Sequence, residues 1–214
     1  MDLTGAIKHI KVKAKQVNNL PSGLRILVDF NEQDSAYGDA QGLLAGFLGI
    51  LACNCNLFPI DFERWTGKVG IPEDYFNDCF ATIIKVRFSF KTTKALAKRY
   101  CKISMGKKWS AHKQRLWSEF NIPTKTIDEI IRNVPNGIDK DQWVRFVQYR
   151  MKPSTQERCR KNKENRSKQV IPHTGGSKAN SRRRHEIFLE TGKLPSRAQM
   201  YILTHTKKGW ILCQ

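Results

Sequence analysis

The chain has 214 residues, and its 38 Lys and Arg outnumber its 19 Asp and Glu, which gives a formal net charge of +19. Hydrophobic residues make up 40% of the chain and aromatic residues 10%, enough for a folded core, which excludes wholesale disorder. The mean hydropathy of −0.53 argues against an integral membrane protein, and the positive excess favours a polyanionic partner, either nucleic acid or an anionic membrane surface.

The N-terminal segment is basic. Its first twenty residues hold four Lys with no apolar run behind them, so we do not expect a secretory signal and predict a basic N-terminal tail at residues 1–22. Without such a signal, the six Cys are expected to be reduced and buried thiols rather than disulfides.

A strand and an apolar helix are predicted next. Residues 24–30 (LRILVDF) are few and rich in branched apolar side chains, which is typical of a strand. Residues 39–52 predict a helix in which Gly42, Gly46 and Gly49 recur at helical spacing and allow a neighbouring element to approach closely. Its apolar part covers about half of the roughly 20 residues needed to cross a bilayer, so we expect a buried helix and no membrane partner.

The following segment predicts further helices. Pro72 opens the first, with two carboxylates at its positive end and an apolar stripe behind them. Residues 92–102 and 107–120 predict two more helices, joined around residues 104–106. In the second of these, Trp, Leu and Phe mark the side that is expected to face the core.

Residues 139–151 predict another helix, with Asp139 or Asp141 as its cap. This helix closes a predicted helical core domain at residues 23–151. The fold class is therefore expected to be mainly α, a helical core with one short N-terminal β-strand or hairpin.

The C-terminal part is divided in two. Residues 152–179 are polar and basic, and we expect them to form a linker or basic arm that orders only on a partner. Residues 180–208 predict a pair of helices joined by a turn at 192–195, similar to a helix-turn-helix, followed by a tail at 209–214.

Two segments hold the excess positive charge. Residues 79–118 contain eleven Lys or Arg and neither Asp nor Glu, and residues 150–184 contain twelve basic residues against two acidic ones. Solvated helical faces usually mix both signs, so a single-sign face favours a charged partner over a basic surface kept for solubility. The residues expected to contact a polyanionic partner are Lys107, Lys108, Lys113, Arg115, Arg160, Lys161, Lys163, Arg166, Lys168, Arg182, Arg183 and Arg184.

The sequence offers little for catalysis. Metal-dependent cleavage of nucleic acid needs several carboxylates that converge on two ions, and Asp29 and Asp61 are the candidates. Further carboxylates are missing from residues 79–118, and Cys53-x-Cys55 is too tight for the usual zinc knuckle. We therefore predict no catalytic residue, no metal, no cofactor and no small-molecule substrate.

Four short motifs follow one another in the C-terminal half. They are KNKENR at residues 161–166, HTGGS at 173–177, GKLPS at 192–196 and THT at 204–206. This series closely resembles the plant transposase family called Ptta/En/Spm, which shows the same motifs in the same order.

The resemblance extends loosely toward the N-terminus and spans residues 24–208. The segment GKKW at residues 106–109, with Lys113 behind it, is similar to a Gly-Lys-x-Trp-Arg element of the family, although Ser110 stands where Arg is usual. The segment DQW at residues 141–143 is similar to the family's Trp-containing helix.

The resemblance implies transposon ancestry, a plant source and a nuclear, DNA-associated role. Together with the charge pattern it predicts a protein that binds duplex DNA through basic helices and a basic arm, without catalytic activity of its own. An active transposase that acts through Asp29 and an RNA- or protein-interaction module are the alternatives, and a homo-oligomer is left open. The Arg182–Arg184 run is also a weak match to a nuclear import signal.

Overall fold

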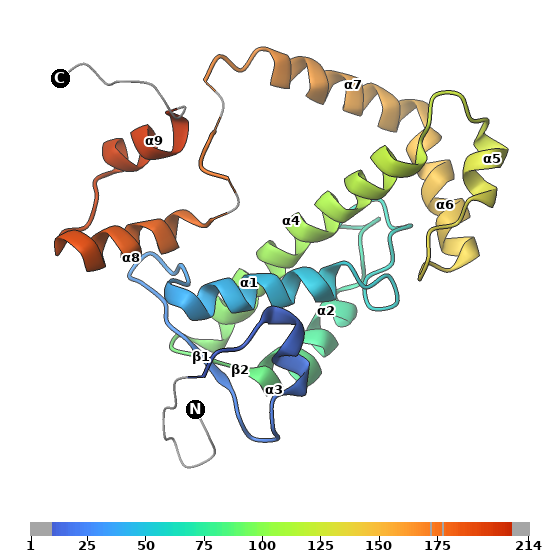
Figure 1. Ribbon diagram of the computed structural model, residues 1–214. Helices are drawn as coiled ribbons and strands as arrows, with labels where there is room; N and C mark the ends of the chain where they lie inside the picture. Colours follow the sequence, from blue (N-terminus) through green and yellow to red (C-terminus); the bar gives the residue numbers. More distant parts are fainter. Residues whose placement is uncertain (1–9, 172, 177, 207–214) are drawn as a thin grey trace.

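The computed structural model describes residues 10–171, 173–176 and 178–206, so the predicted tail at 209–214 and the first nine residues of the tail at 1–22 lie outside the described residues. Most of the described chain is helical, and a small sheet lies toward the N-terminal end (Figure 1). The predicted fold class is confirmed. Among the described helices, none combines the length and the apolar character needed to cross a bilayer.

The sheet joins two segments that are far apart in sequence. β1 (Ile26–Val28) runs parallel to β2 (Phe88–Phe90), and the side chains of Val28 and Phe88 are buried in the core. The strand predicted within residues 24–30 is confirmed. Its partner was not predicted, because a three-residue segment carries too little alternation to indicate a strand.

α1 (Gly38–Ala52) is packed on several sides, and its glycines are the reason. A Cβ atom at Gly46 would lie 2.7 Å from the Cβ atom of Ala14 in η1 (Ala14–Asn19), and one at Gly42 would lie 2.7 Å from Nη1 of Arg182. The close approach expected at these glycines is therefore confirmed. η1 falls within the segment predicted as a tail, yet its Val17 is fully buried against the core.

α2 (Glu73–Cys79) continues through a π-helical turn, η2 (Phe80–Ile84), into the short α3 (Lys85–Arg87). The helix predicted to open at Pro72 is confirmed, and Pro72 is its N-cap residue. The apolar stripe of this run is buried beside α1 and the sheet.

α4 (Lys94–Phe120) is one helix of 27 residues, so the prediction of two helices joined around residues 104–106 is wrong. Gly106 lies inside the helix and leaves room for a ring, since a Cβ atom there would come within 2.5 Å of Cδ1 of Trp65. Met105 and Trp109, on either side of Gly106, are buried in the same cluster. Burial of this face outweighs the modest helix propensity of glycine, about 1 kcal/mol below that of alanine.

A second apolar cluster forms around α5 (Ile127–Arg132) and α6 (Lys140–Met151), at the far end of α4. Trp143, Phe146 and Val147 are fully buried there, and the indole N–H of Trp143 donates to the carbonyl of Ile130 at 3.0 Å. α6 begins where predicted, with the Asp139 carboxylate accepting from the backbone N–H of Gln142 at 2.9 Å. α5 was not predicted.

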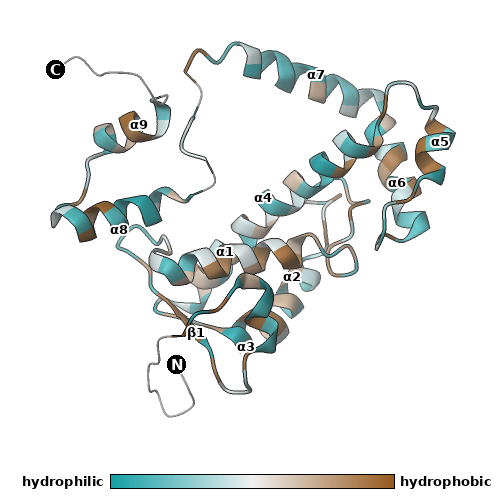
Figure 2. Cartoon of the chain, viewed as in Figure 1, coloured by the Kyte–Doolittle hydropathy of each residue, from teal (hydrophilic) through white to brown (hydrophobic). Residues whose placement is uncertain are grey.

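α7 (Pro153–Ser167) occupies most of the segment that the sequence predicted as a linker or arm ordering only on a partner. Pro153 stands at the first helical position, where its missing N–H costs no hydrogen bond. Thr155 is buried, the other residues of the helix are exposed, and the helix is largely hydrophilic along its length (Figure 2). The absence of an apolar face hid this helix from a reading based on hydrophobic periodicity.

α8 (Asn180–Thr191) and α9 (Arg197–His205) are the predicted C-terminal pair, joined through Gly192 in a left-handed conformation and capped at Ser196. α8 returns to the N-terminal part of the molecule. The Ser181 hydroxyl donates to the carbonyl of Ala36 at 2.7 Å, and the ring of His185 lies 4.7 Å from that of Tyr37. This contact was not predicted from the sequence.

Candidate nucleic-acid interface

Of the four α4 cations expected to contact DNA, three reach the surface. Lys107 and Arg115 are exposed, and Lys108 is partly exposed because its side chain lies along α1 beside Gly49. Arg115 Nη2 lies 3.0 Å from Nδ1 of His112. These cations project from a helix that contains neither Asp nor Glu between residues 94 and 118, so the helix itself offers them no neutralising carboxylate over that stretch.

Lys113 differs, and the expectation that it lies on the exposed face is wrong. Its side chain is 5% exposed. Nζ donates to the carbonyl of Phe62 and lies 4.2 Å from the centre of the Trp109 ring and 4.8 Å from that of Tyr149. The sequence held the signal, because Trp109, Lys113 and Leu116 follow the i, i+4, i+7 spacing of one buried face.

Burial sets the protonation of Lys113. Loss of solvent, with a smaller effect of the nearby Arg150 guanidinium, lowers the pKa of Lys113 from its usual 10.5 to about 7. The rings over which Nζ lies favour the charged form, and so do Asp61 and Glu63, but burial exceeds these effects.

The α7 cations are all exposed, and the helix pairs some of them with its own carboxylates. Glu157 contacts Arg160 at 2.8 Å and Lys161 at 3.5 Å, and Glu164 contacts Lys168 at 2.9 Å. Such pairs stabilise a helix by a few tenths of a kcal/mol each. No ion pair of Lys163 or Arg166 occurs within the described part of the chain.

The three consecutive arginines of α8 make contacts within the protein. Arg182 Nη2 lies 3.0 Å from the Asp39 carboxylate, Arg183 donates to the carbonyl of Gly175, and Arg184 Nη1 donates to Oε1 of Gln33 at 3.5 Å. Their side chains are partly buried, and they fasten α8 to the core. A contact of these arginines with DNA stays a prediction.

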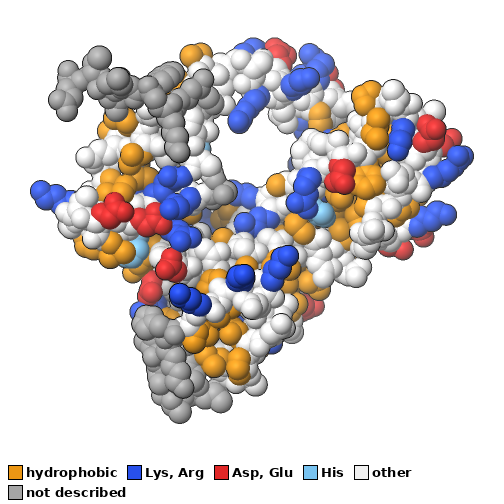
Figure 3. Space-filling view, viewed as in Figure 1, with side chains coloured by type: hydrophobic (Ala, Val, Ile, Leu, Met, Phe, Trp, Pro, Cys, Tyr) orange, Lys and Arg blue, Asp and Glu red, His pale blue; other side chains and the backbone are white. Residues whose placement is uncertain are grey.

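The chain encloses an opening. Figure 3 shows a gap through the molecule with Lys and Arg side chains on its rim, and Figure 1 shows α4 and α7 on two sides of it. The gap is closed on one side because α8 contacts α1. The basic helices α4 and α7 thus border the same opening, although α7 packs on α6.

A cleft of about 500 Å³ lies where α4, α6 and α7 converge with the loop at residues 63–65. We call it the cationic cleft, because Lys113, Arg150 and Arg158 line it from three different helices. Its aromatic walls are Trp65, Trp109 and Tyr149. The sequence analysis did not predict Arg150 or Arg158 as binding residues.

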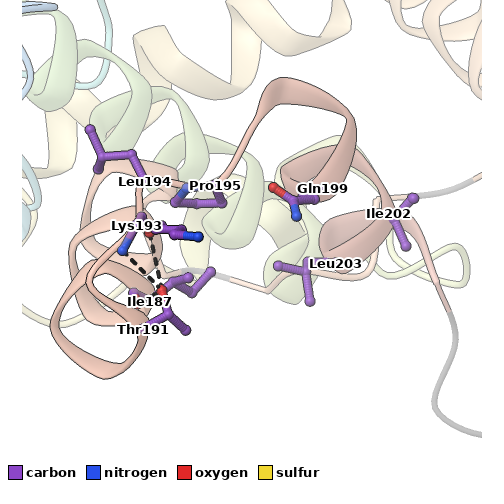
Figure 4. Close-up of a pocket in the computed structure, with 8 residues that line it drawn as sticks. All are labelled: Ile187, Thr191, Lys193, Leu194, Pro195, Gln199, Ile202 and Leu203. Carbon is purple, nitrogen blue, oxygen red and sulfur yellow. Dashed lines mark hydrogen bonds between the residues drawn. The ribbon is translucent and has the colours of Figure 1, made fainter.

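A different surface lies between α8 and α9. An apolar groove of about 460 Å³ lies there. Figure 4 shows Ile187, Leu194 and Leu203 among the residues that line it. At its edge the Thr191 hydroxyl donates to the carbonyl of Ile187 at 2.7 Å and accepts from the backbone N–H of Lys193 at 3.3 Å. Leu194 and Leu203 are more than half exposed, at 63% and 53%.

The candidate catalytic carboxylates do not meet. Asp29 pairs with Lys91 at 2.7 Å, and Asp61 pairs with Arg145 at 2.7 Å. Within the described residues, no three His, Cys, Asp or Glu side chains are grouped as metal ligands. The five Cys of the described part are free thiols, and burial raises the pKa of Cys101 to about 12, while Cys213 lies outside it.

Comparison with known protein families finds a match for one region of the chain. Residues 139–209 match the family model described as plant transposase (Ptta/En/Spm family). This region is similar to the Ptta/En/Spm transposases. The match covers about a third of the chain, so the looser resemblance over residues 24–138 stays a prediction. No curated protein and no solved structure matches the chain.

The transposase-related region contains α6, α7, α8 and α9. It therefore includes every predicted DNA contact from Arg160 to Arg184, whereas the cations of α4 precede it. It also supplies two of the three helices that form the cationic cleft.

Proposed function

We propose that the protein is a DNA-binding protein derived from a plant transposon, which contacts duplex DNA in the nucleus and acts by binding rather than by catalysis. The observation that carries the proposal is that two basic helices, α4 and α7, border the same opening. The transposase relationship of residues 139–209 supports DNA over other polyanions.

Burial changes the set of residues proposed to contact phosphates. Lys113 is buried, and the arginines of α8 make contacts within the protein, so the proposal rests on eight cations of α4 and α7. They are Lys107, Lys108, Arg115, Arg160, Lys161, Lys163, Arg166 and Lys168. Contacts of this kind supply affinity and register but little sequence selectivity.

A salt titration on duplex DNA tests the proposal. Each neutralised phosphate releases counterions and adds about −0.9 to the slope of log K against log salt, so full engagement of the eight cations gives a slope of about −7. We expect this dependence in fluorescence anisotropy with a labelled duplex. A flat titration would refute the proposal.

A matched pair of variants locates the contacts. Replacing Lys107, Lys108 and Arg115 by Gln is expected to make the slope shallower by about 2 to 3. The control removes three charges elsewhere, Lys125, Arg132 and Lys140, and is expected to leave the slope unchanged. Equal effects of the two triple variants would show that net charge alone drives binding.

The alternatives are distinguished by simple measurements. An active transposase predicts magnesium-dependent nicking that is lost on Asp29→Asn, whereas the Asp29–Lys91 pair supports a structural role for this carboxylate. An RNA- or protein-interaction module predicts that single-stranded RNA or an acidic protein competes better than duplex DNA.

A further inference from the structure

The lining of the cationic cleft includes one carboxylate, Glu63, beside four cationic side chains. Lys113, Arg150 and Arg158 converge on it from α4, α6 and α7. Among the described residues none of these three forms an ion pair, because the nearby acids pair with other cations, Glu63 with Lys152 and Asp61 with Arg145, each at 2.7 Å. Lys113 is buried, Arg150 partly buried and Arg158 exposed, so an external anion can reach the group from the side of Arg158 and compensate its charge.

The existing contacts hold these cations in place without neutralising them. Arg158 Nη2 donates to the hydroxyl of Tyr149 at 2.7 Å. Arg150 Nη2 donates to Oε1 of Gln114 at 3.3 Å, and its guanidinium lies 4.9 Å from the centre of the Trp117 ring. The acceptors are neutral oxygens, and the rigid placement lowers the ordering cost of binding a ligand.

Two buried donors of the lining have no acceptor within the described structure. They are Nε of Arg150 and Nε1 of Trp65. Nε1 of Trp65 packs against Gly106 of α4, so of the two donors only Nε of Arg150 belongs to a cation that lines the cleft. Buried polar atoms in native proteins are nearly always hydrogen-bonded, and an oxyanion beside the Arg150 guanidinium supplies acceptor oxygens.

We propose that the cationic cleft binds a phosphomonoester dianion, the terminal phosphate of a DNA strand. A terminal phosphate carries about −1.5 to −2 charges at neutral pH, which matches the two arginines better than the single charge of an internal phosphodiester. Arg guanidinium groups bind phosphate oxygens through paired N–H donors, and Lys contributes a compact charge. The inference rests on the proposed DNA binding and names a specific subsite for it.

The protonation of Lys113 is consistent with such a site. Burial and Arg150 lower its pKa to about 7, while Arg158 acts in the same direction and Asp61 and Glu63 oppose it. An anion in the cleft would favour the charged amine.

The first arm of the test uses inorganic phosphate and the full chain. We expect saturable binding by calorimetry, with a shift of the Trp65 indole N–H resonance in NMR spectra assigned by Trp65→Phe. Arg158→Gln, which changes an exposed side chain of α7, is expected to weaken phosphate binding by about tenfold or more, the effect of losing a charged hydrogen bond.

Two further variants test whether a loss of phosphate binding comes from the cleft and not from unfolding or from net charge. Lys113→Met retains the apolar stem and removes the charge, and it is expected to weaken phosphate binding while the thermal unfolding curve stays cooperative. Lys140→Gln removes one exposed charge at the start of α6, away from the cleft lining, and is expected to bind phosphate as the wild type does. Absence of binding to the wild type, or equal affinities of the wild type and Arg158→Gln, would overturn the inference.

The second arm separates the sources of phosphate. A duplex with a 5′- or 3′-terminal phosphate is expected to bind more tightly than the same duplex with hydroxyl ends, and Arg158→Gln is expected to abolish this difference. Equal affinities for all end types would overturn the subsite, while a steep salt dependence would leave the proposed function standing. Binding of inorganic phosphate without any binding of duplex DNA would overturn the proposed function and the DNA end as the ligand, and would leave only an anion site in the cleft.

Discussion

Lys113 makes the stability of the fold depend on pH in a range where few other side chains titrate. In the folded chain its pKa lies near 7 because the amine is buried, whereas in the unfolded chain it takes its usual value of 10.5. Between these values the unfolded state binds more protons than the folded state. Stability therefore rises as the pH increases from 7 toward 10.5.

The size of the effect follows from the two pKa values. Each pH unit between them contributes about 1.4 kcal/mol, and about half a proton is still bound to the folded state at pH 7, so the gain between pH 7 and pH 9 is about 2 kcal/mol. The buried thiols Cys55, Cys79 and Cys101 act oppositely, because in the unfolded chain they are already half ionised at their usual pKa value of 9.0 while burial keeps them protonated in the fold. Together they lower stability by about 1 kcal/mol between pH 7 and pH 9, so the difference between the wild type and Lys113→Met isolates Lys113.

Urea unfolding at pH 7, 8 and 9 measures this gain. The buffer must contain no phosphate, because a bound anion would change the protonation of Lys113. In Lys113→Met the titrating amine is absent, so the free energy of unfolding is expected to fall by about 1 kcal/mol over the same range, through the thiols alone. If the wild type and the variant changed equally with pH, the buried amine would not be the cause and the reasoning would fail.

Three further predictions concern packing, and each is read from urea unfolding. Trp143→Ala should cost about 3 to 5 kcal/mol, because a fully buried ring leaves a cavity; a loss below about 1 kcal/mol would contradict the burial. Gly106→Ala should destabilise by about 1 to 3 kcal/mol, since the new methyl group would meet the Trp65 ring at 2.5 Å, and Trp65→Leu should relieve the loss. Arg182→Gln should cost less than about 1 kcal/mol, because the side chain of its partner Asp39 is 97% exposed. A larger loss would contradict the view that this exposed ion pair contributes little to stability.

Several elements were predictable because their signals are local. α1, α6 and α9 show helical spacing of apolar residues or clear caps, and the Asp139 and Ser196 caps form the hydrogen bonds that their positions indicate. The concentration of positive charge in residues 79–118 and 150–184 is likewise a property of the chain itself. So are the transposase motifs, whose region is confirmed over residues 139–209.

The errors arose where distant residues decide the outcome. Gly106 looked like a helix break, but Trp65 from a separate loop fills the space beside it and the helix continues. The helix α7 has no apolar face, so its pattern resembled that of a linker, although Pro153 and ion pairs within the helix stabilise it. Local propensity is a weak prior that tertiary contacts override.

The sequence by itself determined how much positive charge the protein has and which segments carry it. The tertiary structure decided where that charge is available. It buries Lys113 among Trp109, Phe146 and Tyr149, and it pairs Arg182 of α8 with Asp39 of α1. It also brings Arg150 and Arg158 beside Lys113. Charge is a property of composition, whereas exposure depends on which segments pack together, and those contacts join residues that no local pattern relates.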